Sequence, residues 1–229
     1  MKKIMMVVMA AVAVANVALA RDVKNVGKDE GEAFNSFLQS YYREPDVTKA
    51  IGYISFAETM VKKKMTTATP IAGFYFGASK TAPMHKAEWQ VAKDKAKSKW
   101  LVKAIDDGLA RKALEDVMPG NANNIGPDAL DFIWGYFFAT GDKEAPRRII
   151  KRGAVKFPED AAIDITAKAA QWSTFAIAND HPIVREELEV FAKGASVAEL
   201  RNFFGGEVPG HVKAYLSGDA VKKIEGLGR

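Results

Sequence analysis

The stretch that decides the fold is D-F-I-W-G-Y-F-F-A-T-G-D, residues Asp131 to Asp142. It places five aromatic residues within seven positions and then ends at Thr-Gly-Asp. Its large apolar side chains, with the leucine just before it, recur at the spacing of one helix face. They are Leu130, Ile133, Trp134, Phe137 and Phe138. This pattern predicts a helix whose aromatic stripe is buried in a core.

Two aromatic residues of this stretch, Phe132 and Tyr136, fall off the stripe. We therefore expect them at a contact between helical units or in an exposed groove. Gly141 is a suitable end for the helix, because glycine readily adopts the left-handed conformation found there. Asp142 is a suitable N-cap for the next helix. The stretch thus predicts a helix, a tight turn and a second helix.

The same helical spacing recurs along the rest of the chain, and no segment alternates as a strand would. The Asp106-Asp107-Gly108 triplet predicts a break inside one long helix, and residues 118–127 form the clearest loop. The helix predicted over 160–178 is apolar on two opposite faces, one of which carries Trp172, so we expect both faces to be covered. The predicted helices span 29–42, 45–64, 71–78, 83–117, 130–140, 144–156, 160–178, 181–195, 196–204, 211–216 and 220–224.

One arrangement appears three times, in residues 74–83, 136–146 and 175–182. In each case an aromatic-ended helix stops at a small polar turn, and a second helix starts with an early proline. Proline is tolerated there because the first N–H groups of a helix have no intrahelical partner. Repeated helix pairs predict an all-α fold, built as a helical-hairpin array or as a compact helical bundle.

The best single unit, Pro127 to Asp160, resembles a degenerate tetratricopeptide repeat. The residues that carry this resemblance are Ile133, Phe137, Gly141, Ile150, Gly153 and Pro158. Trp134 and Pro146 depart from the family pattern, which prefers a small residue and alanine at these positions. The resemblance implies a solenoid of helical hairpins that binds proteins or peptides on its concave face.

The first twenty residues have the pattern of a secretory signal peptide. Two lysines precede a nearly uninterrupted apolar run, which ends at Ala-Leu-Ala. Cleavage after Ala20 leaves residues 21–229, which we expect to form a single all-α helical-repeat domain. An uncleaved membrane anchor is the alternative, although the run is short and rich in alanine. The signal is of bacterial type, which indicates a periplasmic or secreted protein with no further transmembrane segment.

Composition excludes several functional classes. The chain has no cysteine, which rules out disulfides, thiol catalysis, zinc–thiolate sites and iron–sulfur clusters. The formal net charge of +5 is a mild excess and includes the two lysines of the predicted signal peptide. A nucleic-acid-binding protein usually shows a concentrated basic face, so we expect no nucleic-acid partner.

The sequence offers no recognisable catalytic motif. It contains no G-x-S-x-G, Walker or G-x-G-x-x-G pattern, and its three histidines are scattered. His85 and Glu88 are a single pair, whereas helical metal sites need several such pairs. We therefore expect no enzyme activity, no catalytic residue, no cofactor and no bound metal. A hydrolase with scattered carboxylates is the least favoured alternative, and it would need a cleft with two convergent carboxylates or a strongly shifted pKa.

The leading functional hypothesis is a module that binds or scaffolds a protein or peptide. The predicted binding residues are Tyr136, Arg148 and Arg152, and the two arginines share one face of a basic helix. This face also suits contact with an anionic surface, although a solvated outer face explains it as well. The alternative function is a carrier or sensor of a small apolar ligand, held in a cavity bounded by Trp134 and Trp172.

Overall fold

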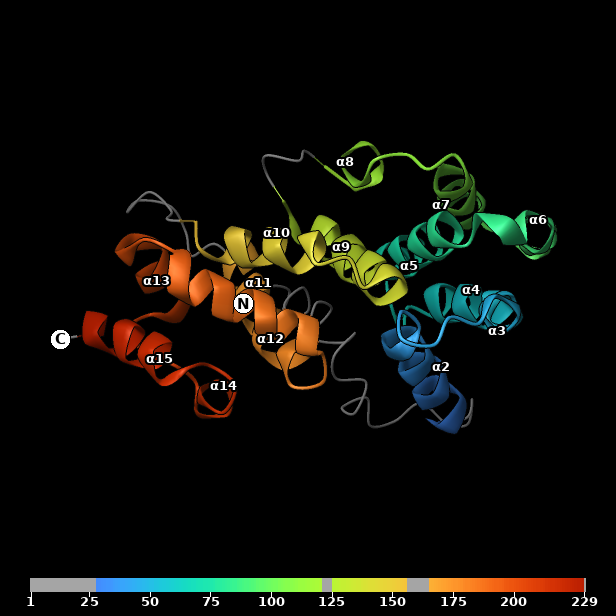
Figure 1. Cartoon of the computed structure of the whole chain (residues 1–229). Helices are drawn as coiled ribbons and strands as arrows, with labels where there is room; N and C mark the ends of the chain where they lie inside the picture. Colours follow the sequence, from blue (N-terminus) through green and yellow to red (C-terminus); the bar gives the residue numbers. More distant parts are fainter. Residues whose placement is uncertain (1–27, 121–124, 156–164, 229) are drawn as a thin grey trace. The chain divides into compact units, whose positions relative to one another are not determined.

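The computed structural model describes residues 28–120, 125–155 and 165–228, so the predicted signal peptide lies outside the described residues. Helices account for all the regular structure of this part of the chain, which confirms the all-α prediction (Figure 1). Chain contacts divide it into an N-terminal unit, residues 28–142, and a C-terminal unit, residues 143–228. This boundary falls inside the predicted repeat of residues 127–160.

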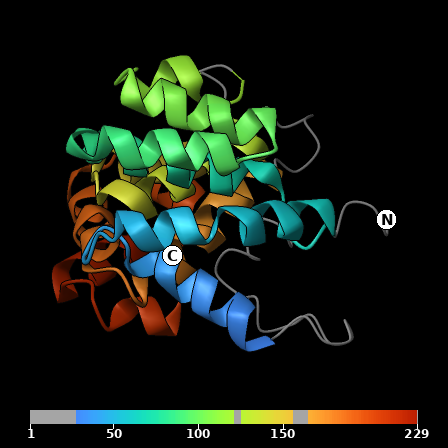
Figure 2. The ribbon, with the colours of Figure 1, turned by 90° about the vertical axis from the view of Figure 1, so that its right-hand side faces the viewer.

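The N-terminal unit contains eight of the described α-helices and one short 3-10 helix. They are α2 (Lys28–Ser40), α3 (Val47–Gly52), α4 (Ile54–Lys62), α5 (Ala68–Thr81), η2 (Pro83–His85), α6 (Lys86–Lys95), α7 (Lys99–Leu109), α8 (Leu114–Val117) and α9 (Pro127–Thr140). Figure 2 shows α3 and α4 following one another nearly in line, joined at Tyr53. The predicted helix 45–64 is therefore two helices, and it begins after Pro45 because the Asp46 carboxylate caps Lys49 N–H at 2.8 Å.

Helix α5 is the centre of the N-terminal unit, since α7 and α9 both pack closely against it. The stripe of α9 is buried as predicted, with Trp134, Phe137 and Phe138 almost without exposed surface. The crossing of α5 and α9 depends on glycine. A Cβ atom at Gly73 would lie 2.1 Å from the Phe132 carbonyl oxygen, and one at Gly135 would lie 2.0 Å from that of Pro70.

One of two local predictions near these helices is wrong. The helix predicted over 83–117 does divide near the Asp106-Asp107-Gly108 triplet, since α7 ends at Leu109, and it is also interrupted at Ala96, whose backbone is extended. Gly108 lies in the last turn of α7, where a Cβ atom would come within 2.0 Å of the Ser79 hydroxyl oxygen. Gly141 ends α9 in the left-handed conformation as predicted, but Asp142 does not cap α10. Its carboxylate accepts a hydrogen bond from the Tyr136 hydroxyl at 3.1 Å.

The C-terminal unit contains the remaining helices of the described chain. They are α10 (Glu144–Gly153), α11 (Ile165–Ala178), α12 (Pro182–Gly194), α13 (Val197–Phe204), α14 (Gly210–Lys213), α15 (Gly218–Glu225) and η3 (Gly226–Gly228). Pro146 and Pro182 lie in the first turns of α10 and α12, as the early-proline pattern predicts. Ser196 caps α13 in a reciprocal capping box with Glu199.

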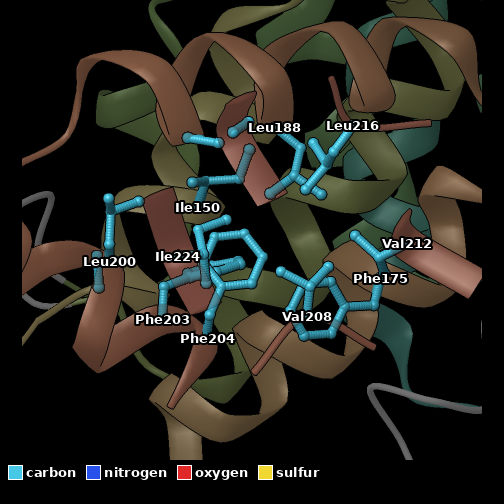
Figure 3. Close-up of a cluster of buried hydrophobic side chains, with 13 residues drawn as sticks. Ile150, Phe175, Leu188, Leu200, Phe203, Phe204, Val208, Val212, Leu216 and Ile224 are labelled. Carbon is cyan, nitrogen blue, oxygen red and sulfur yellow. The ribbon is translucent and has the colours of Figure 1, made fainter. Parts of the chain in front are cut away.

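A second hydrophobic core fills this unit. Its side chains come from α10, α11, α12, α13, α14 and α15. Figure 3 shows them converging, with the rings of Phe203 and Phe204 among them. Helix α10 packs on α11 and α12, and α15 packs on α12 and α13. Each unit contains a closely packed pair of helices, α5 with α9 in the first and α10 with α11 in the second. These pairs are compatible with a helical repeat or a helical bundle.

Candidate functional site

The three residues predicted to bind a partner do not meet in one unit. Tyr136 belongs to the N-terminal unit, and only 6% of its surface is exposed. Burial and the neighbouring Asp142 carboxylate raise the pKa of Tyr136 to about 12, so its hydroxyl stays protonated. Arg148 and Arg152 lie one turn apart on α10 in the C-terminal unit, and both are half-buried.

The off-stripe aromatic residues of α9 contact a neighbouring helix. The rings of Phe132 and Tyr136 lie 5.8 and 5.6 Å from the ring of Phe76 on α5. Both residues are buried and pack on α5 of the same unit, which favours a contact between helices over an exposed groove. The role of Tyr136 in binding stays a prediction.

The basic face of α10 is partly engaged within the C-terminal unit. Arg147 donates to the buried carboxylate of Glu187 on α12, with one N–H···O distance of 3.1 Å, and also pairs with Glu144. These contacts hold the Arg147 pKa above its usual value, so its charge serves the packing of α10 on α12. Lys156, the last residue of the predicted helix 144–156, lies outside the described residues. Contact of Arg148 and Arg152 with an anionic surface stays a prediction.

The C-terminal unit has an open groove between α11 and the end of α13. Its volume is about 650 Å³, within the range of about 300 to 1,000 Å³ typical of ligand sites. The residues that line it come from α11, among them Trp172 and Phe175, from the end of α13 with Phe203 and Phe204, and from the segment that follows α13.

Trp172 is the main exposed apolar group of the groove. Half of its surface is exposed, which corrects the expectation that both apolar faces of its helix are covered. Three buried phenylalanines line the same groove, and the Phe175 ring is 5.4 Å from that of Phe203 and 5.7 Å from that of Phe204 (Figure 3). A tryptophan side chain offers a large apolar contact area with little conformational entropy to lose.

Gln171 fixes the position of this surface. Its amide nitrogen donates to the Gly153 carbonyl at 2.8 Å and to the Asn202 carbonyl at 3.0 Å. Asn202 in turn donates to the Ala154 carbonyl at 3.1 Å. These buried hydrogen bonds tie α11 and α13 to the end of α10, so the two walls of the groove are held by side chain-to-backbone contacts.

The rim of the groove is polar and carries both signs of charge. Lys168 donates to the Gln171 amide oxygen at 3.2 Å, while Glu207 and His211 are exposed on the opposite wall. Glu207 is the only carboxylate among the described residues that line the groove. The groove therefore lacks the pair of carboxylates that the hydrolase alternative needs. No group of three metal-binding side chains occurs within the described ranges.

One carboxyl group does have a strongly shifted pKa. Burial, with a smaller contribution from the Asp128 carboxylate, raises the pKa of Asp131 to about 7, and a hydrogen bond with Thr67 opposes the rise. Asp131 is 5% exposed on α9 and does not line the groove. Asp131 meets the shifted-pKa condition named for the hydrolase alternative, but it is buried in the N-terminal unit and lines none of the described pockets. The hydrolase alternative therefore stays an untested prediction.

Comparison with known proteins adds no relative. No family model, curated protein or solved structure matches the chain. Among the described helices, none combines the length and the apolar composition needed to cross a membrane.

Sequence reasoning missed the groove because it treated Trp172 as a core residue. A signal was nevertheless present: Lys168 and Asn179 lie four residues before and seven residues after Trp172, on the same helix face. Polar residues at this spacing distinguish a face that meets solvent from one that meets another helix. The turn at Gly205-Gly206 also forms a wall of the groove rather than a simple connection.

Proposed function

We propose that this protein is a periplasmic or secreted helical-repeat module that binds an extended segment of a protein or peptide. The observation that carries the proposal is Trp172, half-exposed in an open groove of about 650 Å³ that the buried Phe175, Phe203 and Phe204 also line. Tryptophan is enriched among the residues that dominate binding energy at protein interfaces. The groove is the binding site, and the protein acts without catalysis.

The chemistry of the groove favours a peptide over a wholly apolar molecule. An aromatic or long aliphatic side chain of the peptide covers Trp172 and removes its exposed surface from water. Lys168, Glu207 and His211 surround this contact with hydrogen-bonding groups of both charge types, which suit a peptide backbone and its flanking side chains. Because the groove is open, a segment of a longer chain can lie across it.

Two features of the sequence support the wider setting. The signal-peptide pattern of residues 1–20 directs the chain to the periplasm or the exterior. The tetratricopeptide-like pattern of residues 127–160 supports a helical-hairpin array, a class of fold that generally binds partners. Arg148 and Arg152 then contribute a second, charged contact to an acidic segment of the partner.

The proposal is tested by selecting peptides from a random displayed library with residues 21–229 as bait. We expect the enriched peptides to share an aromatic or aliphatic anchor and to bind with a measurable dissociation constant by calorimetry. Trp172→Ala removes the main contact, so we expect affinity to fall by roughly 30-fold or more. Val190→Ala is the matched control, because Val190 is also an exposed apolar residue but does not line the groove.

An Arg148→Glu/Arg152→Glu variant tests the predicted charged contact in the same assay. We expect weaker binding of peptides that carry acidic residues beside the anchor and unchanged binding of peptides that lack them. Selected peptides that bind the Trp172→Ala variant as tightly as the wild type would contradict the assignment of the groove. A library that yields no peptide would contradict the function itself.

A further inference from the structure

The N-terminal unit has a small apolar pocket that the peptide groove does not involve. It lies between α5, α7 and α9 and has a volume of about 210 Å³. The buried rings of Phe76 and Phe132 and the half-buried ring of Trp100 line it. Ala68 and Ala72 on α5 leave the space open, because neither residue has a side chain long enough to fill it.

A basic hollow adjoins this pocket. Its volume is about 510 Å³, and four lysines and two aspartates line it together with Val102. Lys103 and Asp107 line both the pocket and the hollow, so the two spaces share a boundary. The lysines of the hollow are Lys97, Lys99, Lys103 and Lys112, which exceed the aspartates by two positive charges.

The charges of the hollow are not all neutralised. Lys112 lies 2.7 Å from the Asp107 carboxylate, Lys103 pairs with the same group, and Asp106 is taken by Lys93 at 2.6 Å. Burial alone would raise the pKa of Asp107, but hydrogen bonds from the two lysines outweigh it and lower the pKa. Within the described residues, neither Lys97 nor Lys99 has an ion-pair partner.

The segment that carries these two lysines is held in place. The backbone N–H groups of Lys97 and Ser98 both donate to one carboxylate oxygen of Glu58, at 2.8 and 2.6 Å. This contact sets where α7 begins and keeps Lys97 and Lys99 at the edge of the hollow. The positive charge is therefore presented by an ordered segment, which reduces the entropy lost when an anion binds.

We propose that the pocket and the hollow together bind a small anionic amphiphile. Its apolar part enters the pocket beside Trp100, and its anionic head lies among Lys97, Lys99 and Lys103. A wholly apolar ligand would leave the lysines unused, and an inorganic anion would leave the pocket empty. The pocket is smaller than the roughly 300 Å³ at which drug-sized ligand sites begin, so the apolar part is one ring or a short alkyl chain.

This site is independent of the proposed peptide groove, because each lies wholly inside a different unit. The shared chemistry of the ligand is an anionic head joined to an apolar tail. Such a group comes either from a free amphiphile or from the surface of a lipid bilayer. The size of the pocket favours the free molecule, which can present its whole tail, and the test separates the two sources.

The test is calorimetric titration of the full mature chain with octyl sulfate, below the concentration at which it forms micelles. Octyl glucoside has the same tail and an uncharged head, and it is the ligand control. We expect saturable binding of one octyl sulfate per chain, weakened by added salt, and binding of octyl glucoside that is at least about tenfold weaker. Equal binding of the two ligands would overturn the proposal.

Two variants locate the site. Lys97→Gln/Lys99→Gln removes charges that make no ion pair, so the fold is kept, and we expect roughly three- to tenfold weaker binding of octyl sulfate. Lys62→Gln/Lys63→Gln is the matched control, because these exposed lysines lie outside the hollow. Ala72→Phe fills the pocket, and we expect it to abolish binding while the circular dichroism spectrum stays that of the wild type.

Vesicles of phosphatidylcholine with phosphatidylglycerol form the last arm. We expect no co-sedimentation of the protein with them at the concentrations that suffice for octyl sulfate. Binding to vesicles without binding to free octyl sulfate would overturn the proposal, since it would show a surface contact rather than a site for one molecule. Unchanged affinity of the Lys97→Gln/Lys99→Gln variant for octyl sulfate would also overturn the proposal. This test does not depend on whether the Ala72→Phe variant folds.

Discussion

Asp131 is a carboxyl group enclosed in the core of the N-terminal unit. Desolvation disfavours its charged form, and the Asp128 carboxylate one turn earlier adds repulsion. The opening sequence places this acid beside an aromatic stripe, but periodicity alone does not reveal how far it is buried. Its pKa of about 7 makes the stability of the protein depend on pH near neutrality.

The direction of this pH dependence follows from the proton balance. Between pH 4 and 7 the folded protein keeps the Asp131 proton that the unfolded chain has released, so folding is favoured at the acidic end. The contribution is complete below the ordinary pKa of 3.8 and is lost as pH rises through about 7. The difference between the two pKa values corresponds to a change of roughly 4 kcal/mol in the free energy of unfolding. Relaxation of the protein around the charged carboxylate reduces this change, and we expect about 1 to 3 kcal/mol.

Asp131→Asn should therefore remove this pH dependence, since asparagine stays neutral. We expect the variant to be about 1 to 3 kcal/mol more stable than the wild type at pH 8, and no more stable at pH 4. Urea unfolding followed by circular dichroism at the two values measures the difference. Asp128→Asn is the control, because that side chain is exposed and we expect a much smaller effect. Parallel pH profiles for the wild type and Asp131→Asn would contradict the assignment.

At the level of helices, the sequence predicts the buried stripes well and the close crossings poorly. Periodicity counts large apolar side chains, so it identifies the aromatic face of α9 correctly. It passes over Gly73 and Gly135, which have no side chain to count yet determine how near α5 and α9 approach. The same limitation applies to Gly108, which lies one residue before the end of α7. A Cβ atom there would meet Ser79 and Phe76, and the pattern of turn residues does not reveal this contact.

Gly135→Ala should separate α5 from α9. Alanine normally favours a helix over glycine, but here its Cβ atom would lie 2.0 Å from the Pro70 carbonyl oxygen. We expect a loss of about 3 kcal/mol or more in the free energy of unfolding. Gly31→Ala on α2 is the matched control, because no atom lies near its Cβ position, and we expect a gain of up to about 1 kcal/mol. Similar effects of the two substitutions in urea unfolding would refute the close crossing.

At the level of the whole molecule, length and periodicity predict one domain, whereas chain contacts define two compact units. The sequence gives little sign of the boundary, because Gly141 followed by Asp142 has the pattern of a turn within one hairpin. The candidate groove was equally hard to foresee. Apolar residues on both faces of α11 indicate that either face could pack against another helix. They do not indicate that the face of Trp172 meets solvent.

The two units should also differ in how they respond to damage in their cores. Leu188→Ala leaves a cavity in the C-terminal core, where Leu188 is fully buried, and should cost about 2 to 5 kcal/mol locally. Hydrogen exchange measured by mass spectrometry should show faster exchange in residues 143–228 and little change in residues 28–142. Leu101→Ala, at a fully buried position of the N-terminal unit, should give the opposite pattern. Faster exchange throughout the chain in both variants would favour the single domain predicted from length.

The glycines of the N-terminal unit also limit how this sequence can diverge. Exposed lysines can be exchanged over generations without altering the fold, because their side chains meet mainly solvent. Positions 73, 108 and 135 have no such freedom, since any residue with a Cβ atom would meet a backbone carbonyl of α5 or α9. Related proteins that keep the packing of α7 and α9 on α5 must keep all three glycines, at spacings of 35 and 27 residues. These glycines would therefore identify distant relatives after most other identical residues are lost.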